Sequence, residues 1–469
     1  NPVDGSNLFY RALDNPRWIA KYNEYTSKVN RVYGALSVGY DVTDWLNVQL
    51  RGGMNTYTDR RSDVVRSGGI NSPLGFVISD VLTNTEQDYN LIFTVQKDLN
   101  EDFALRAIVG GNANQRSFVR TRVTGTEIIS DGLNTGLYKL DATASQIANT
   151  DYTSLRRLNS LFTDVSLSFK DFLFLNLSGR NDWSSTLPPD NNNYFYPAAS
   201  VSLVLSDVVS MPSFINMAKV RAAAAKVGSD ANVYQTSTNY VIGVPFTGAA
   251  KFNRASLSNT LGNPGLKPEF TTEYEGGIEM QFLSGRIGFD LTYFTRTSTD
   301  QIISAALPRS TGFTQQIINF GELDNKGWEL ALNATPVKLS NGFTWDMSVA
   351  YTRIRSTVVD AGPTKEIIVG GPGTSLATIH RNGKPYGQIF GTKNARSADG
   401  QLLIDPNTGM PFVLQDSEII GDPNPDFTLG WNNTFSFKGV SLRALIDWKQ
   451  GGDFYSFTGA SLLLRGQLK

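Results

Sequence analysis

The feature that most constrains this chain is a two-residue alternation of apolar and polar side chains across residues 161–206. The alternation breaks at Lys170-Asp171 and again at a longer polar loop over residues 182–196. A period of two places successive side chains on opposite faces of a β-strand. One face carries mostly leucine and valine, and the other carries serine, asparagine, aspartate, arginine and lysine. The stretch therefore predicts antiparallel strands with one apolar and one polar face.

The same alternation recurs along most of the chain, in pairs of segments joined by a short connection. The short connections are predicted at residues 41–44, 97–102, 170–171, 207–216, 284–285, 339–342 and 438–439. The long polar connections are predicted as loops at about 58–87, 116–158, 182–196, 228–268, 297–326 and 355–425. Seven short connections imply about 14 strands of about 10 residues each. Residues 217–227 favour a helix by intrinsic propensity, but their place in the series predicts a strand.

Short connections that alternate with long ones are typical of a transmembrane β-barrel, which has short periplasmic turns, long extracellular loops and strands that are apolar outside and polar inside. Aromatic residues support this interpretation. Tyr40 and Phe437 lie near short connections, and Tyr293 and Trp328 lie near long ones, as two interfacial girdles require. We therefore predict an all-β, antiparallel, multi-pass barrel in the cell outer membrane.

Composition excludes several other classes of protein. The chain has 469 residues and a net charge of -1, which gives no basic surface for nucleic acid. It has no cysteine, so disulfides and thiolate metal sites are excluded. No run of about 18 apolar residues predicts a transmembrane helix, and no signal peptide is recognised. The protein is therefore expected to be either soluble, or a mature or partial chain.

Catalytic motifs are not recognised. His380 is the single histidine, and neither a Ser-His-Asp set nor a histidine metal cluster can be built around it. The GGPG run at 370–373 lacks the strand, lysine and serine context of a phosphate loop. We expect no catalytic residue, no metal site and no cofactor, and a surface position for the histidine.

Three glutamates, Glu273, Glu275 and Glu279, lie on one face of a predicted strand. Paired carboxylates can hydrolyse glycosides. Charged side chains that face a wet interior explain them more simply, because Arg286 and Arg296 on the facing strand can pair across.

Aromatic residues crowd the predicted outer loop at 182–196. Such rings can stack on a sugar or hold a peptide, or they can form an interfacial girdle and a loop core. The polar residues that precede the loop can hold substrate or pin the loop. The candidate substrate-lining residues are Arg180, Asp182, Trp183, Tyr194, Tyr196, Glu279 and Arg286.

Four longer segments resemble a known family. They are SGRNDWSSTLPPDNNNYFYPAASVSLVLSD (178–207), LGNPGLKPEFTTEYEGGIE (261–279), TYFTRTSTDQI with NFGELDNKGWEL (292–302 and 319–330) and GDPNPDFTLGWNNTFSFKGVSL (421–442). They are similar to the C-terminal barrel of SusC/RagA-like TonB-dependent transporters of Bacteroidota. The resemblance implies a 22-stranded barrel with a plug domain, opened by TonB-ExbB-ExbD and energised by the proton-motive force. It also implies a SusD-like surface lipoprotein as a lid.

The chain departs from the family pattern in two ways. No plug domain, TonB box or N-terminal β-domain is recognised, and about 14 strands fall short of 22. Residues 1–469 are therefore expected to be a partial receptor barrel with two open edges, which favour aggregation. Family members often carry a calcium-loop-like run near residues 399–418, but DPNTG at 405–409 lacks the ligand spacing and predicts a plain hairpin turn.

The resemblance implies active import of a nutrient oligomer, either an oligosaccharide or an oligopeptide, across the outer membrane and in contact with its lipid, without enzymatic activity. A structural barrel that serves as a scaffold in an envelope complex is the alternative. A soluble β-rich hydrolase is a third possibility, and it predicts soluble expression without detergent.

Overall fold

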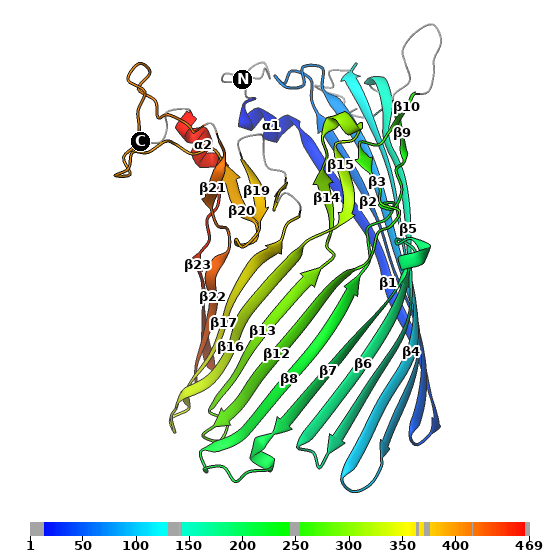
Figure 1. Ribbon diagram of the computed structural model, residues 1–469, viewed down its shortest axis with the longest axis vertical. Coiled ribbons are helices and arrows are strands. Elements are labelled where there is room, and N and C mark those ends of the chain that lie inside the picture. Colours follow the sequence, from blue (N-terminus) through cyan, green and yellow to red (C-terminus); the bar gives the residue numbers. More distant parts are fainter. Residues whose placement is uncertain are drawn as a thin grey trace. The chain divides into compact units, whose positions relative to one another are not determined.

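The computed structural model describes residues 14–129, 140, 143–243, 254–362, 365–369, 376–414 and 416–464. Its main element is one sheet of 14 strands (Figure 1). In the order in which they pair, the strands are β1 (Glu24–Thr43), β2 (Leu46–Val65), β3 (Phe76–Asp98), β4 (Phe103–Ile128), β5 (Thr143–Phe169), β6 (Leu173–Ser184), β7 (Asn193–Val204), β8 (Ile215–Ser229), β12 (Glu269–Phe282), β13 (Ile287–Thr299), β16 (Glu322–Lys338), β17 (Phe343–Asp360), β22 (Pro425–Phe437) and β23 (Val440–Gly451). The predicted fold class and strand number are confirmed.

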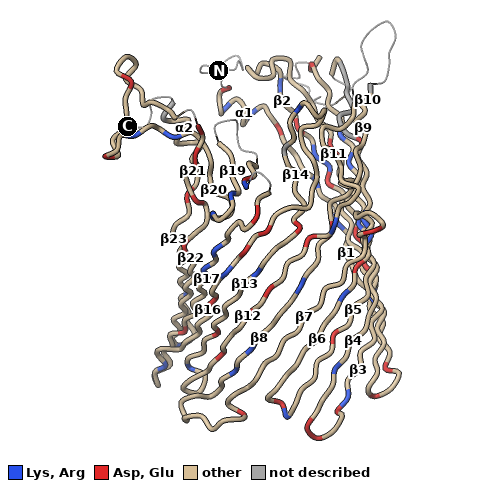
Figure 2. The backbone as a smooth tube through the Cα atoms, viewed as in Figure 1, with Lys and Arg blue, Asp and Glu red and all other residues tan. Residues whose placement is uncertain are grey.

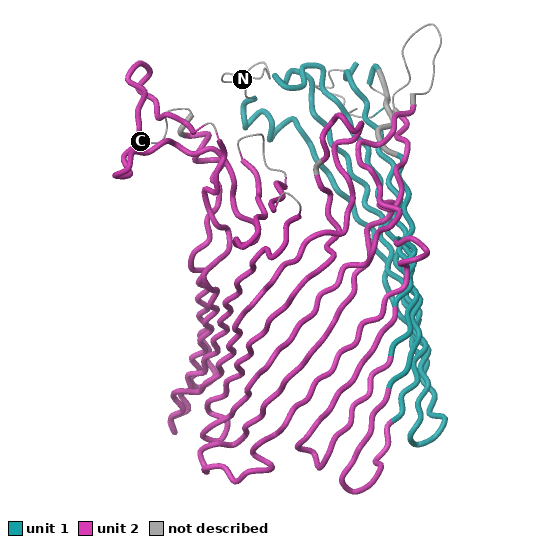
Figure 3. Tube along the Cα trace, in the orientation of Figure 1, with its two compact units in different colours: residues 1–95, 108–162, 182–186 teal, residues 96–107, 163–181, 187–469 magenta. Residues whose placement is uncertain are grey.

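The chain divides into two compact units (Figure 3). Unit 1 comprises residues 1–95, 108–162 and 182–186, and unit 2 comprises residues 96–107, 163–181 and 187–469. Each unit is described by itself below.

Tight turns close the short connections. In the turn between β22 and β23, Lys438 and Gly439 have φ values of 46° and 88°. Two successive positive φ values match the twist of the flanking strands. Lys170 and Asp171 join β5 to β6 with φ values of 48° and 57°, and the Lys170 ammonium lies 3.6 Å from the Asp102 carboxylate of the neighbouring turn.

The apolar face of the sheet does not pack into a core. Ile278 is 44% exposed and Leu442 is 65% exposed, and Leu173 and Leu291 are half-buried. Two residues of the described ranges, Leu266 and Ile379, combine large side chains with complete burial. An apolar sheet face without a packing partner requires another apolar medium to cover it.

Strand β8 forms against its intrinsic propensity. Its residues 222–225 are four alanines, which favour helix, yet β8 pairs with β7 on one side and with β12 on the other. Backbone hydrogen bonds to two neighbours outweigh the propensity of a single segment, so the predicted strand is confirmed.

The strands of unit 1 extend further than the sequence pattern predicts. The connection between β2 and β3 is residues 66–75, and strand structure includes 58–65 and 76–87, where a loop is expected. Beyond the apolar band the two-residue alternation stops, because residues 58–63 are polar on both faces and residues 76–78 are apolar on both. Alternation therefore cannot reveal a strand there. Charged residues therefore occur along the strands as well as in the connections (Figure 2).

Several long connections carry small sheets of their own. β9 (Tyr240–Gly243) pairs with β10 (Arg254–Leu257), and β15 (Gln315–Asn319) lies between β11 (Thr260–Leu261) and β14 (Ile302–Ala306). A four-stranded sheet contains β18 (Glu366–Val369), β19 (Leu376–Arg381), β20 (Gln388–Gly391) and β21 (Glu418–Gly421). The GGPG run at 370–373 lies outside the described residues.

The helices are short. They are α1 (Pro16–Tyr22), α2 (Phe457–Leu464) and the 3-10 turns η2 (Pro189–Asn191), η3 (Leu205–Asp207) and η4 (Arg309–Thr311). Within the described ranges, none of them is long and apolar enough to cross a membrane.

Candidate functional site

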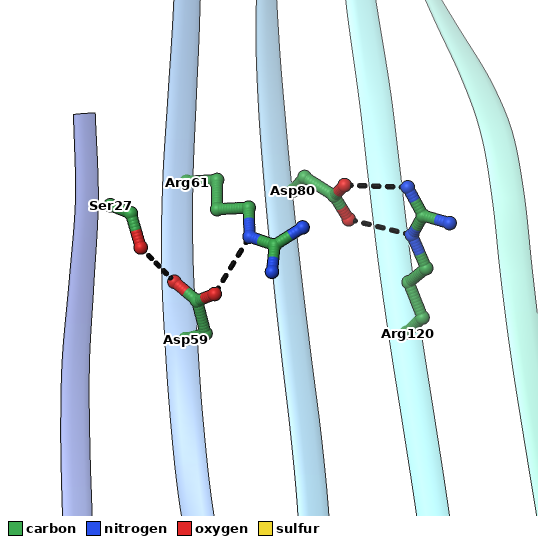
Figure 4. Close-up of polar contacts among 5 residues, drawn as sticks. All are labelled: Ser27, Asp59, Arg61, Asp80 and Arg120. Carbon is green, nitrogen blue, oxygen red and sulfur yellow. Dashed lines mark hydrogen bonds and ion pairs between the residues drawn. The ribbon is translucent and has the colours of Figure 1, made fainter. Parts of the chain in front are cut away.

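The polar face of unit 1 carries a cluster of buried carboxylates, shown in Figure 4. Ser27 Oγ of β1 donates a hydrogen bond to Asp59 Oδ1 of β2 at 2.7 Å, and Arg61 Nε donates to Asp59 Oδ2 at 2.7 Å. Asp59 is 5% exposed. The hydrogen bond from Ser27, reinforced by Arg61, lowers the pKa of Asp59, so this carboxylate is charged at neutral pH.

Asp80 of β3 and Arg120 of β4 form the second part of the cluster (Figure 4). Arg120 Nε donates to Asp80 Oδ1 at 3.0 Å, and its Nη2 donates to Oδ2 at 2.7 Å. This two-bond geometry fixes both planar groups. The hydrogen bonds from Arg120 lower the pKa of Asp80. Asp80 lies nine residues beyond Tyr89, an exposed aromatic residue of the apolar face, so the cluster lies beyond the apolar band.

Closer to the apolar band, carboxylates of β3 accept from amides of β4. Asn112 Nδ2 and Asn114 Nδ2 both donate to Asp88 Oδ2, at 2.9 and 3.1 Å. Arg116 Nη2 donates to Glu86 Oε1 at 2.9 Å. The polar face of unit 1 is thus a ladder of charge-assisted hydrogen bonds.

In unit 2, Arg221 of β8 reaches across β12 to β13. Its guanidinium donates to both oxygens of Asp290, at 2.6 and 2.8 Å, and to Thr292 Oγ1 at 2.5 Å. Gly277 of β12 lies beneath the guanidinium, and a Cβ atom at this position would lie 2.7 Å from Arg221 Cζ. The absence of a side chain at Gly277 is what allows the arginine to cross.

Two further ion pairs lie on the same face, and the second of them lines a depression. Lys219 Nζ lies 3.7 Å from Glu279 Oε2, and Arg296 Nε donates to Glu273 Oε2. The depression has a volume of about 600 Å³, and its lining includes alanines of β8 together with Glu273, Glu275 and Arg296. A cavity of this size on a polar face can hold part of a hydrated solute.

The seven predicted site residues lie in different surroundings. Asp182 is buried in unit 1, and Trp183 is exposed and lines a groove with Leu50 and Tyr89 on the apolar face. Arg180 is half-buried in β6. The structure therefore places Trp183 among apolar residues, and a substrate contact of Arg180 or Asp182 stays a prediction.

Tyr194 and Tyr196 stack on each other with ring centroids 6.0 Å apart. Both belong to an apolar cluster at the long-connection end of unit 2, in which Leu187, Ala231, Leu266 and Ile317 are buried. This placement matches the loop core considered as the alternative to sugar stacking.

Glu279 and Arg286 do not form an ion pair with each other. Glu279 pairs with Lys219, whereas Arg286 lies at a short turn and donates to the carbonyl oxygens of Thr335 and Pro336, at 3.2 and 3.3 Å. Pairing of a glutamate with an arginine of the facing strand is found for Glu273 and Arg296.

Sequence reasoning missed the cluster of Ser27, Asp59, Arg61, Asp80 and Arg120, because these residues lie where a loop was expected or next to it. The signal in the sequence was the run DRRSD at residues 59–63, in which two aspartates flank two arginines.

The arrangement offers solvation and positioning of a solute. Among the described residues, no group of three His, Cys, Asp or Glu side chains could hold a metal ion. His380 is half-buried, not a free surface residue, and stacks on Tyr386 with centroids 4.3 Å apart. At the DPNTG turn, Asn407 N and Thr408 Oγ1 donate to the two oxygens of Asp405. The Asp405 carboxylate therefore stabilises the turn to which it belongs.

Comparison with known proteins relates the chain to outer-membrane receptors. The chain is 26% identical over 391 residues to TonB-dependent receptor P26 of Formosa agariphila, which covers 77% of this chain and 38% of that protein. It is 26% identical over 212 residues to TonB-dependent receptor SusC of Bacteroides thetaiotaomicron, covering 41% of this chain and 21% of that protein. The chain thus spans less than half the length of these relatives.

The fold has a close counterpart among solved structures. The structure of the RagAB peptide transporter superimposes with a TM-score of 0.78 at 17% identity, over 95% of this chain and 51% of that chain. The family model described as TonB dependent receptor-like, beta-barrel matches residues 1–386. The chain therefore belongs to the family of TonB-dependent receptor β-barrels.

Proposed function

We propose that this chain is the barrel portion of a transporter that imports a nutrient oligomer, an oligosaccharide or an oligopeptide, across the bacterial outer membrane. The observation that carries the proposal is the division of the 14-stranded sheet into an exposed apolar face and a polar face of paired charges. Lipid covers an apolar sheet face, and water with opposite charges solvates the polar one. Such a sheet can line a hydrated path.

Membership of the TonB-dependent receptor family supports energised import. In this proposal TonB-ExbB-ExbD acts through a plug and a TonB box outside residues 1–469, and a SusD-like lipoprotein covers the extracellular end. The similarity to SusC and to the RagAB peptide transporter supports this assembly. The solvating polar face offers both signs of charge, which suits uncharged sugars and zwitterionic peptides alike.

Uptake measurements test the proposal. Cells with and without the gene are given fluorescent oligosaccharides and oligopeptides, and accumulation is followed with and without a protonophore. Import predicts that the deletion abolishes accumulation of at least one oligomer, that the intact gene restores it and that the protonophore blocks it. Unchanged accumulation of every oligomer would refute import, and a general loss of envelope integrity would favour the scaffold role.

A further inference from the structure

A shallow groove of about 430 Å³ lies on the apolar face of unit 1 and crosses the strands from β2 to β6. Four strand spacings separate β2 from β6, so the groove is about 19 Å long. Its lining includes five apolar or aromatic side chains, each between 37% and 60% exposed: Leu50, Tyr89, Leu91, Leu161 and Trp183. Side chains so exposed are favoured by contact with an apolar occupant from outside the described chain.

The polar residues of the lining belong mostly to the other face of the sheet. Asn112 donates to Asn90 Oδ1 at 2.8 Å on the polar face, and Ser160 is buried next to Leu161. Alternate residues of a strand project to opposite faces, so the backbones of these three residues border the groove. Asn159 is different, because it shares a face with Leu161 and is exposed.

The groove fits one acyl chain of a membrane lipid. Half of the hydrocarbon core of a bilayer is about 15 Å thick, which is close to the length of the groove. The groove is also continuous with the exposed apolar face that lipid covers in the proposed function.

Polar groups follow the groove at its long-connection end. On β5, Leu161, Asn159 and Arg157 succeed one another on one face, and all three are exposed. Ser185 N, two residues beyond Trp183, donates to Arg157 O at 3.0 Å. Arg157 lies four residues beyond Leu161, about 13 Å along the strand. The order of groups is an apolar groove, an amide and a guanidinium, which matches the chain, the ester carbonyl and the phosphate of a phospholipid.

The Arg157 guanidinium has donors left for a phosphate. Its Nε donates to Gln115 Oε1 of β4 at 2.9 Å, which holds the group over β4. An arginine has five N–H donors, and no ion pair of Arg157 is found among the described residues. The nearby carboxylates of β3 are bonded to arginines on the polar face. A planar guanidinium with free donors suits a phosphate group.

We propose that the groove binds one acyl chain of an anionic phospholipid from the leaflet at the long-connection end of the sheet. The chain packs on Leu91, Leu161 and Trp183, the Asn159 amide donates to an ester carbonyl oxygen, and the Arg157 guanidinium donates to the phosphate. The inference rests on the proposed location in the outer membrane. It goes beyond general lipid contact, because it assigns one lipid class to one place on the apolar face.

Fluorescence quenching by brominated lipids tests the site. The full-length protein is reconstituted in phosphatidylcholine vesicles with a minor fraction of phosphatidylglycerol, and the acyl chains of one lipid or of the other carry bromine. Every protein is measured with and without Trp183→Phe, so that the difference reports on Trp183. We expect phosphatidylglycerol to be enriched at Trp183 about fivefold over its mole fraction, the factor that one basic residue near an anionic headgroup supplies.

Two variants remove the two halves of the site. Arg157→Gln should lower the enrichment to the mole fraction. Arg353→Gln is its matched control and should keep the enrichment, because Arg353 is an exposed arginine opposite Trp328 on the apolar face of unit 2. Gly111→Leu should fill the groove and also lower the enrichment.

Gly111→Leu is expected to fold, because a Cβ atom at Gly111 would lie 3.7 Å from Leu161 Cδ2, an ordinary contact. Gly34→Leu is its matched control, since a Cβ at Gly34 of β1 meets open space, and it should keep the enrichment. Thermal unfolding in phosphatidylcholine vesicles shows which variants fold. If Arg157→Gln does not fold, Gly111→Leu decides.

Several results would overturn the proposal. They are equal quenching of Trp183 by the two lipids, enrichment that persists in Arg157→Gln or Gly111→Leu, and an equal loss in Arg353→Gln or Gly34→Leu. Pairing of two copies that shields Trp183 alone from both lipids would assign the groove to a second copy of the chain.

The same vesicles separate this site from the proposed function. Absence of quenching of any tryptophan by brominated phosphatidylcholine would contradict contact with lipid, and with it the proposed function. Quenching without enrichment of phosphatidylglycerol, with energised uptake intact in cells, removes the site and leaves the import function. Enrichment without uptake of any oligomer leaves the site and removes the import function.

Discussion

Replacing Gly277 by alanine is expected to displace the guanidinium of Arg221 and break its bonds to Asp290. A Cβ atom at Gly277 would lie 2.7 Å from Cζ, 2.8 Å from Nε and 2.9 Å from Nη2 of Arg221. These distances are shorter than carbon contacts in folded proteins allow. The clashing atoms are the far end of a flexible side chain, so the arginine moves and the backbone of β12 keeps its place.

The magnitude follows from the exposure of the ion pair. Hydrogen bonds to charged groups contribute about 1.5–3 kcal/mol when sheltered, and exposed ion pairs contribute about 0.2–1 kcal/mol. The Arg221 and Asp290 side chains are 27% and 36% exposed, which places them between these cases. Gly277→Ala should therefore lower the free energy of unfolding by about 1 kcal/mol.

A double-mutant cycle isolates this effect. Gly277→Ala is made in the wild type and in Arg221→Ala, and urea unfolding of the full-length protein in detergent is followed by tryptophan fluorescence. With the arginine removed, the same alanine should cost nothing. Gly430→Ala is the matched control, because Gly430 of β22 faces open space on an interior strand.

Two outcomes would refute the reasoning. If Gly277→Ala costs as much in the Arg221→Ala background as in the wild type, the glycine has a role other than giving room to the guanidinium. If Gly430→Ala costs the same as Gly277→Ala, the loss belongs to glycine in a strand and not to the ion pair.

Asp80→Asn is expected to lower the free energy of unfolding by about 2 kcal/mol at pH 7. Its arginine partner lowers the pKa of Asp80. The difference in unfolding free energy from the wild type should therefore be complete above the ordinary carboxyl pKa of about 3.9 and shrink as pH falls through the lowered pKa. Unfolding measured at a series of acid pH values tests this dependence. Since the chain has no cysteine, Asn407→Cys should react with an impermeant maleimide in intact cells, and Ser340→Cys in a short turn should react only after lysis. Labelling of both in intact cells would contradict the proposed orientation. Ile278→Lys on the apolar face should cost about 2–4 kcal/mol in lipid, whereas Gln281→Lys on the other face should cost far less; equal costs in vesicle unfolding would contradict the lipid contact.

The sheet is predictable from sequence because each strand meets two different media. Leu173, Ile278 and Leu442 lie on the exposed apolar face, and their alternate neighbours form the polar face. This requirement acts on every strand in the apolar band, so even the alanine-rich β8 could be placed from its position in the series. The short turns were predictable for a related reason, since each marks a reversal of the same alternation.

The candidate site was less predictable because its residues lie beyond the band. Asp59 lies in a segment that is polar on both faces, and Asp80 lies in a segment in which apolar and polar residues do not alternate. The two-residue pattern therefore predicts no strand at either position. Their pairing depends on register across strands, since Asp80 lies 40 positions from Arg120 and Asp59 lies 32 positions from Ser27. Lys219 was missed as the partner of Glu279 because it comes from β8, the neighbour of β12 on the side away from β13, where it is the register partner of Glu279.

Charge pairing characterises the polar face of unit 2. Arg221 with Asp290 and Arg296 with Glu273 satisfy each other, so a passing solute gains little by displacing either partner. A path that conducts needs such a surface, because a solute must bind weakly enough at each point to move on.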